Sequence, residues 1–353
     1  MIASATARSK VWATAPGKVI ITGEHAVVYG QPALAAAINR RTTASVSWQP
    51  AAPGAEVLVN LDLPQLDLQR CLSVAQLQQL AQHVATQHKA FLAGQVDLPS
   101  LFASPEELLL AALGYGITAN ALTMQQHLDI TLQTELLLGG GMGSSASMVT
   151  VLMAALLAAN DCPFDAHSLY QQVLVAEQWQ HGRSSGLDPH ICIAGGVQFL
   201  QSGQYRKLDV EIPQQWFLVA SGKPQSSTGE CVEQVRQQQH SKAFWQQFGD
   251  LAQAMERALL EADYSALLAL IKTNHSWLQA LHVVPQKVAD FICQVEQAGG
   301  AGKICGAGSI RGEAGGLVLV AGVQAEQLQA LCEPVDYKYW PFECAPQGLA
   351  HGH

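Results

Sequence analysis

The sequence has few charged residues and no long run of one sign. Of its 353 residues, 13% are charged and 49% are hydrophobic, and the formal net charge is −9. So few charges beside so many apolar residues exclude a disordered chain. An acidic chain without a basic run also lacks the cationic surface that neutralises a nucleic-acid backbone. We therefore expect a globular protein with no nucleic-acid partner.

Long apolar segments and closely paired cysteines are missing too. The longest nearly unbroken apolar stretch, Met148 to Ala159, is well short of the roughly 20 residues of a membrane span, which predicts a buried helix and no membrane partner. The opening residues, MIASATARSK, lack the apolar segment of a secretory signal, so we expect a cytoplasmic protein. None of the eight cysteines forms a C-x-x-C pair, which argues against a zinc ribbon or a disulfide framework.

The length and the alternation of strand-like and helix-like segments predict two α+β domains. A single core usually stops growing at about 250 to 300 residues, and we place the boundary after a hairpin that ends near Pro213, giving domains 1–213 and 214–353. Helices are expected over 72–92, from a capping box at Ser104, from about Ser144, and over 165–180. We also expect a short alanine-rich helix at 32–38, a strand over 128–138, and helical stretches at 228–261, 264–281 and 286–298.

A glycine-rich loop joins the strand at 128–138 to the apolar helix that follows it. This loop, GGGMGSSAS over 139–147, places glycines where a chain approaches a ligand closely and serines where a helix exposes its first N–H groups. Such a helix start is an anion site. The loop is not a Walker loop, because no lysine follows its last glycine. A simple glycine turn with a serine N-cap stays open as the alternative.

Four charged residues interrupt apolar surroundings. Lys18 and Glu24 lie in APGKVIITGEHAVVYG, and Glu177 shares a helix face with Leu169 and Val173, so both acids and the lysine call for partners if buried. Asp188 lies between small residues and a proline, in a setting typical of a rigid loop that directs a side chain. Taken singly, Lys18 could reach water from a strand end, and either Glu177 or Asp188 could be a cap or a surface charge.

The order of these segments carries more information than any one of them. APGK-x(5)-EHAVVYG, then GMGSSAS, then E-x(10)-D ending in HGRSSGLD, then GAG near the C-terminus resembles the GHMP kinase superfamily. Within it, GEHAVVYG followed by PALAAAI is similar to the mevalonate kinase family, and the resemblance runs from Ala15 to Gly316. It implies an α+β, two-domain GHMP kinase fold with the active site in the interdomain cleft, and ATP-dependent phosphorylation of the primary hydroxyl of mevalonate.

The resemblance also implies roles for individual residues. Asp188 matches the catalytic aspartate, Lys18 the active-site lysine, Ser145 and Glu177 the Mg²⁺ ligands, and Glu24 and His25 residues of the substrate pocket, to which Lys18 and Asp188 also belong. Hard oxygen ligands such as these suit Mg²⁺ held together with ATP oxygens. The loop that would bind ATP consists of Gly139, Gly140, Gly141, Met142, Gly143, Ser144, Ser145 and Ala146. A homodimer stays open.

The sequence departs from the family pattern at two loops. Leu137 stands where the phosphate loop usually has proline, Met142 replaces the common leucine, and the third motif reads GAGSIRGEAGG, with Ser309, Ile310, Arg311 and Glu313 among its glycines. A phosphomevalonate kinase, another GHMP kinase or a non-catalytic protein of this fold are the alternatives. Near the motifs we find only Lys18, Arg183, Lys223 and Arg311 as cations, which favours an acceptor without a phosphate of its own.

Overall fold

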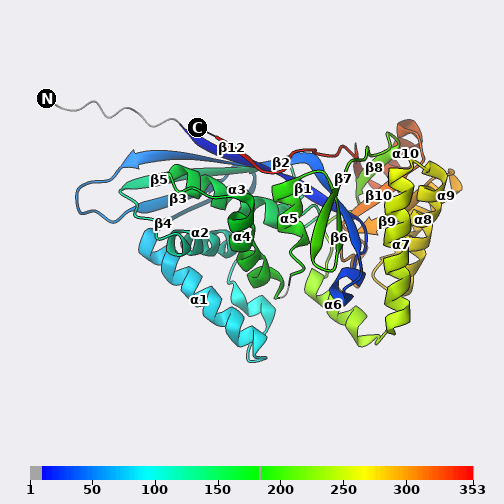
Figure 1. Cartoon of the computed structure of the whole chain (residues 1–353), viewed down its shortest axis with the longest axis horizontal. Coiled ribbons are helices and arrows are strands. Elements are labelled where there is room, and N and C mark those ends of the chain that lie inside the picture. The colour runs from blue at the N-terminus through cyan, green and yellow to red at the C-terminus, as the bar shows by residue number, and fades with distance from the viewer. Residues whose placement is uncertain (1–9, 183, 353) are drawn as a thin grey trace.

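The computed structural model describes residues 10–182 and 184–352 (Figure 1). Arg183 and most of the N-terminal segment used to argue against a secretory signal lie outside this part of the chain. Among the described residues, no helix combines the length and the apolar character needed to cross a membrane.

The first half of the chain forms most of an eight-stranded sheet. Five of its strands follow β12 in the order β12-β1-β2-β5-β3-β4, and the β6–β7 hairpin joins through β2. Antiparallel pairing dominates, and β3 runs parallel to β5. The strands are β1 (Val11–Thr22), β2 (Ala33–Pro50), β3 (Leu58–Leu63), β4 (Leu68–Ser73), β5 (Gln126–Thr134), β6 (Val197–Gln201), β7 (Gln204–Leu208) and β12 (Ala350–Gly352).

The expectation of an alanine-rich helix at 32–38 is wrong, because these residues form the first part of strand β2. Six consecutive residues from Ala33 to Ile38 are buried, so the segment is covered on both faces and shows no alternation. Tertiary context overrides the helix propensity of alanine here. In that stretch β2 is paired with β1 on one side and β6 on the other.

Helix α3 (Ser144–Ala159) lies at the centre of the first half. It packs against β1 and β2 on one side and against α2 and α4 on the other, and nearly all of its residues are buried. This burial confirms the reading of Met148 to Ala159 as a core helix. The other helices of this half are α1 (Val74–Leu92), α2 (Glu107–Ala119), α4 (Ala166–His181) and α5 (Leu187–Ala194).

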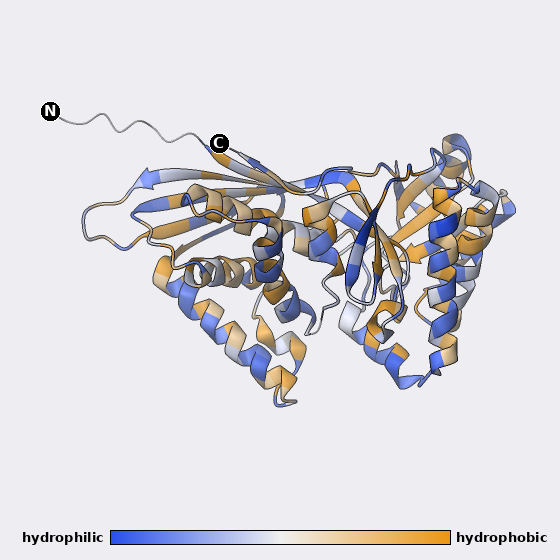
Figure 2. Ribbon diagram, viewed as in Figure 1, coloured by the Kyte–Doolittle hydropathy of each residue, from blue (hydrophilic) through white to orange (hydrophobic). Residues whose placement is uncertain are grey.

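The second half builds a four-stranded antiparallel sheet in the order β11-β8-β10-β9. Its strands are β8 (Trp216–Ala220), β9 (Ala301–Cys305), β10 (Leu317–Ala321) and β11 (Lys338–Pro341). Helices α6 (Thr228–Gln237), α7 (Lys242–Leu260), α8 (Tyr264–Ala280), α9 (Gln286–Gln297) and α10 (Ala325–Cys332) accompany them. Figure 2 shows hydrophilic residues along the outer side of α1 and α7 and apolar residues toward the sheets, the pattern of amphipathic helices on a core.

Most predicted elements are present, with shifted ends. The capping box at Ser104 is wrong: α2 begins at Glu107, whose carboxylate accepts from Ala103 N, while Ser104 lies in the preceding turn. Strand β5 ends at Thr134, four residues before the end of the predicted strand. The stretch 228–261 is two helices, because Ser241 caps a new one.

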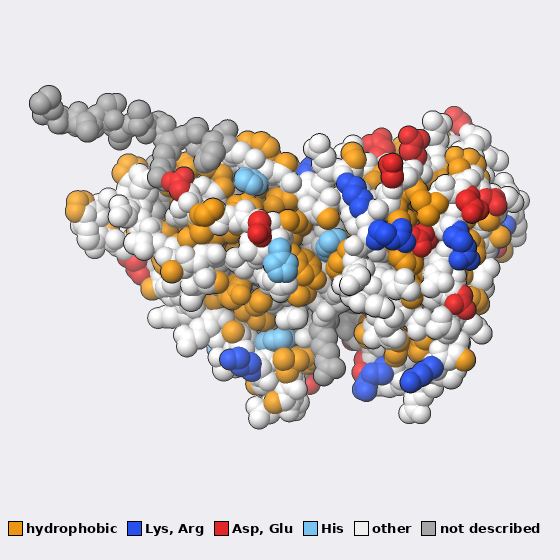
Figure 3. Space-filling model, in the orientation of Figure 1, with side chains coloured by type: hydrophobic (Ala, Val, Ile, Leu, Met, Phe, Trp, Pro, Cys, Tyr) orange, Lys and Arg blue, Asp and Glu red, His pale blue; other side chains and the backbone are white. Residues whose placement is uncertain are grey.

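The two sheets change over between Leu208 and Trp216, close to the predicted boundary at 213. The last strand, β12, nevertheless returns to pair with β1 in the first sheet. The division into domains 1–213 and 214–353 therefore stays a prediction. Figure 3 shows the lower outline of the molecule notched between the two halves.

Candidate active site

Lys18 and Asp188 form an ion pair between β1 and the first turn of α5. Lys18 Nζ lies 3.1 Å from Asp188 Oδ2. The lysine is buried, whereas 27% of the Asp188 side chain is exposed, which leaves that carboxylate accessible to a small molecule. The structure places Asp188 on a short helix after Gly186, which is in the left-handed region, and not in an irregular loop. Two residues 170 positions apart in the sequence therefore meet.

The glycine loop is fixed to β1 beside Lys18. Lys18 N donates to Met142 O at 2.8 Å, and Ser147 Oγ donates to Ala15 O at 3.1 Å. The Met142 side chain is fully buried, so at this position the loop can offer only its backbone to a ligand. A Cβ added at Gly143 would lie 2.7 Å from Lys18 Cγ. Lys18 can therefore occupy its observed position only because residue 143 is a glycine.

Helix α3 begins at the end of this loop without a side-chain cap. Its N-cap is Gly143, with φ 69°, and no side chain accepts from the first turn. Ser147 N donates to Gly143 O, so the first intrahelical bond is already closed there. The N–H groups of Ser144, Ser145 and Ala146 precede that bond, and none of them donates to a side-chain cap among the described residues. That they bind an anion stays a prediction.

Ser145 and Glu177 come from two helices that meet beside the loop. The Ser145 hydroxyl donates to Gln180 Oε1, and Gln180 lies one turn after Glu177 on α4. A hydroxyl that donates its proton keeps its lone pairs for a cation. Within residues 10–182 and 184–352, no group of three or more His, Cys, Asp or Glu side chains could hold a metal ion.

Burial controls the charge of Glu177. Desolvation, reinforced by the nearby Asp188 carboxylate and opposed by Lys18, raises the pKa of Glu177 to about 8. His181 Nε2 lies 3.5 Å from Glu177 Oε2, but burial lowers the pKa of His181, so this histidine gives little positive charge at neutral pH. For Lys18, burial opposes the charge, yet the Asp188 and Glu177 carboxylates outweigh it and raise the lysine pKa. Glu177 is thus a buried carboxyl whose desolvation outweighs the stabilising charge of Lys18.

The structure brings Glu24 and His25 to a different set of partners. Glu24 is buried in an ion pair with Lys303 of β9, and its Oε2 has no partner among the described residues. His25, with φ 58°, donates from Nε2 to Ala307 O at 3.0 Å, and burial lowers its pKa to about 4. Glu24 therefore connects the segment after β1 to β9, and His25 connects it to the third motif. Their role in binding substrate stays a prediction.

Hydrogen bonds and an ion pair join the divergent third motif to Ser226 and to the first turn of α6. Arg311 Nη2 pairs with Glu230 Oε1 in the first turn of α6, and Ser309 Oγ donates to Arg311 O at 2.7 Å. Ile310 N donates to Ser226 Oγ at 3.2 Å. The inserted residues thus attach this loop to the segment that leads into α6, and Arg311 forms an ion pair with Glu230.

Sequence reasoning missed several residues around the site. Lys303 had a detectable signal, because a lysine inside the buried run AGKIC needs a partner. Gln180 and His181 lie three and four residues after Glu177, on the same helix face. Cys192 lies one turn after Asp188, and burial, followed by the Asp188 carboxylate, holds the pKa of its thiol well above the ordinary value.

Comparison with known proteins identifies the family. The model of the GHMP kinases N terminal domain matches residues 107–196, which include the glycine loop, Glu177 and Asp188, and the galactokinase galactose-binding signature matches residues 4–48. The mevalonate kinase of Archaeoglobus fulgidus is 29% identical over 84% of this chain and 88% of its own length. The crystal structure of the Methanococcus jannaschii mevalonate kinase superposes with a TM-score of 0.75 at 18% identity, over 96% of this chain and 99% of that one.

The Bos taurus mevalonate kinase is 30% identical to this chain over 336 residues, which are 84% of this chain and 83% of the bovine protein. The similarity therefore extends over both halves of the molecule and not only over the glycine loop. With the GHMP kinase fold and this whole-length similarity, the chain belongs to the mevalonate kinase family.

Proposed function

We propose that the protein transfers the γ-phosphoryl group of ATP to the primary (C5) hydroxyl of mevalonate, giving 5-phosphomevalonate in the mevalonate route to isoprenoids. The Lys18–Asp188 ion pair beside the uncapped start of α3 is the observation that carries this proposal. It puts a carboxylate that can orient a hydroxyl next to N–H groups that can hold phosphates.

Phosphoryl transfer needs positioning and neutralisation of charge more than covalent chemistry. In the proposed reaction the exposed part of the Asp188 carboxylate accepts a hydrogen bond from the acceptor hydroxyl and directs that oxygen at the phosphorus. Lys18 holds the Asp188 carboxylate in place through their ion pair and stabilises the negative charge of the transferred group. The glycine loop holds the remaining phosphates through its backbone N–H groups.

Ser145 and Glu177 fit a Mg²⁺ ion that is shared with ATP. Both offer hard oxygen donors, and the raised pKa of Glu177 indicates a carboxyl in need of a cation. When bound, Mg²⁺ would neutralise phosphate charge. Gln180 Oε1 accepts a hydrogen bond from the Ser145 hydroxyl, which leaves the lone pairs of that hydroxyl available to the ion.

The charges around the site favour mevalonate over phosphomevalonate. A phosphorylated acceptor would need several further cations. Among the described residues, however, Lys18 pairs with Asp188, Lys303 with Glu24 and Arg311 with Glu230, and Lys223 alone would not supply them. A single carboxylate, such as that of mevalonate, needs only one cation or a few N–H groups.

Since the acceptor and ATP are both small charged solutes, we further propose that the enzyme acts in the cytoplasm. Cell fractionation tests this location.

An assay of ADP release with mevalonate, phosphomevalonate, homoserine and galactose tests the substrate. Mevalonate should give the highest kcat/KM, and ³¹P and ¹H spectra of the product should place the phosphate on C5. Faster turnover of phosphomevalonate, with that preference lost in Arg311→Ala, would replace this function by phosphomevalonate phosphorylation. No turnover with any acceptor, despite ATP binding, would favour a non-catalytic role.

A further inference from the structure

The second half of the chain covers the tip of the glycine loop. A Cβ added at Gly141 would lie 3.3 Å from Cys305 O, at the end of β9. A Cβ added at Gly316, just before β10, would lie 3.3 Å from Gly140 O. The loop is therefore in backbone contact with the four-stranded sheet, so a side chain from that sheet can reach whatever the loop binds.

Lys223 is such a side chain. It follows β8, and a Cβ added at Gly139 would lie 3.2 Å from Lys223 Cε and 3.7 Å from its Cγ and Cδ. The aliphatic part of the lysine thus runs along the glycine loop. Gly139 has φ 69°, so the loop is bent at the point of contact.

The segment that carries Lys223 is braced. Ser221 donates to Gly316 O from its backbone N at 2.9 Å and from its hydroxyl at 2.8 Å, and its hydroxyl also accepts from Gly315 N at 3.0 Å. Pro224 follows Lys223 and also packs near Gly316, with its Cγ 3.3 Å from a Cβ added at that glycine. Lys223 therefore projects from a fixed base and not from a loose turn.

Lys223 has no acidic partner among the described residues. Lys18, Lys303 and Arg311 each have an acidic partner. In the part of the chain that the structure describes, no hydrogen bond or ion pair is recorded for Lys223, and its side chain is exposed. A triphosphate brings several negative charges to a protein whose net charge is −9, so a local cation at the loop has a large effect.

We propose that Lys223 is a nucleotide-binding residue that contributes a cation from the second half of the chain to the β- and γ-phosphates of ATP on the glycine loop. This inference rests on the proposed function, since it assigns the loop to ATP. It gives the nucleotide contacts on both halves of the molecule, so that ATP binding and the relative position of the two sheets are linked.

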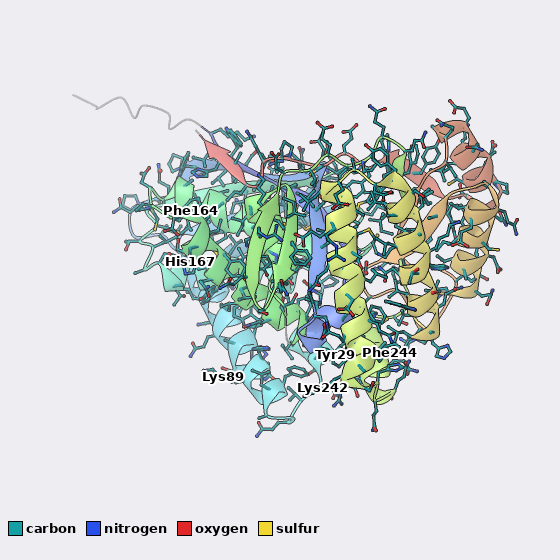
Figure 4. The ribbon with its side chains drawn as sticks, turned by 45° about the vertical axis from the view of Figure 1, so that its right-hand side comes forward. Tyr29, Lys89, Phe164, His167, Lys242 and Phe244 are labelled. Carbon is teal, nitrogen blue, oxygen red and sulfur yellow. The ribbon has the colours of Figure 1, made fainter. Side chains whose placement is uncertain are left out.

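Calorimetric titration of Lys223→Ala with ATP, ADP and AMP tests the proposal. We expect the Kd of ATP to rise about tenfold or more, the scale of one charge-assisted hydrogen bond, and that of AMP to change less than about twofold, because AMP lacks the β- and γ-phosphates. Lys223→Arg should retain most of the affinity. The matched control is Lys242→Ala, an exposed lysine at the start of α7 near Tyr29 and Phe244 (Figure 4), which should bind all three nucleotides as the wild type does.

Three results would overturn this assignment. Unchanged ATP affinity in Lys223→Ala, or an equal loss for ATP and AMP, would show that the lysine does not contact the terminal phosphates. A raised KM for the acceptor with unchanged ATP affinity would assign Lys223 to the other substrate. In all three cases an active wild type would leave the proposed function standing, whereas a wild type that binds no ATP would remove both proposals.

Discussion

At the scale of single residues, the proposed reaction depends most on the partly exposed carboxylate of Asp188. We expect Asp188→Asn to fold normally and to lose at least about a hundredfold in kcat, the scale of an acid–base contribution. ATP affinity should change little, because in the proposed reaction the phosphates are bound by the glycine loop and not by Asp188. Steady-state kinetics and nucleotide titration measure the two effects. Asp250→Asn, at an exposed aspartate on α7, is the control, and near-full activity of Asp188→Asn would exclude Asp188 from the reaction.

Glu177 should make the Mg²⁺ requirement dependent on pH. A proton and the metal compete for this carboxylate, whose pKa is raised to about 8 by burial and by Asp188. Below that pH each unit of increase should therefore strengthen Mg²⁺ binding, by up to about tenfold, and the dependence should level off above it. Glu177→Gln should raise the Mg²⁺ concentration for half-maximal rate more than it changes the KM of mevalonate, and should flatten the pH dependence.

The control for Glu177 is another largely buried acid with a partner elsewhere. Glu256 pairs with Arg206 outside the site, so Glu256→Gln should alter stability and leave the Mg²⁺ titration unchanged. If Glu177→Gln shows the wild-type Mg²⁺ requirement at every pH, Glu177 is a structural acid and the metal is held by other groups.

At the scale of elements, the turn from the glycine loop into α3 decides where Lys18 lies. Gly143→Ala should cost about 1 to 2 kcal/mol of stability for the left-handed backbone and should also displace Lys18, because the new Cβ would lie 2.7 Å from Lys18 Cγ. Gly203, in the β6–β7 turn, has a similar φ of 76° but no atom within 4 Å of an added Cβ. Gly203→Ala should therefore lose similar stability at unchanged kcat.

Thermal unfolding and kcat, measured on both glycine variants, separate the two effects. A fall in kcat of tenfold or more in Gly143→Ala alone supports a loop that positions Lys18. Equal kcat values in the two variants would show that the contact between position 143 and Lys18 has no part in catalysis.

At the scale of the whole molecule, the Glu24–Lys303 pair joins the two sheets. Both side chains are fully buried, so Lys303→Met leaves an unpaired buried carboxylate and should cost about 3 to 5 kcal/mol. The double variant Glu24→Gln/Lys303→Met should recover part of that loss. Denaturant titration of the single and double variants measures the coupling. Lys287→Met, which removes an exposed pair with Glu313, should change stability by less than about 1 kcal/mol. Additive losses in the double variant would contradict the coupling.

Helix positions were predictable where a periodic apolar face and a cap agreed. The expectations at 72–92 and 165–180 match α1 and α4, each with a capping box at Ser73 or Asp165. The failures arose where burial overrode local preference, as in Ala33 to Ile38, which form a central strand despite their alanine content. The predicted start of a helix was also wrong where a turn precedes it, because Ser104 lies in the turn before α2 and does not cap that helix.

The sequence by itself determined the class of the protein, and it indicated the glycine loop and the charged residues that we propose act with it, because these depend on residue types at short spacings. Only the tertiary structure decided which charges meet. Lys18 faces Asp188 across 170 positions, and Glu24 faces Lys303 across 279, because β1 lies beside α5 in the first half and its end reaches β9 in the second. The physical reason is that a buried charge requires a partner, but the identity of that partner depends on how the two sheets pack. The same packing lays Lys223 along Gly139, a contact that no local pattern in the sequence indicates.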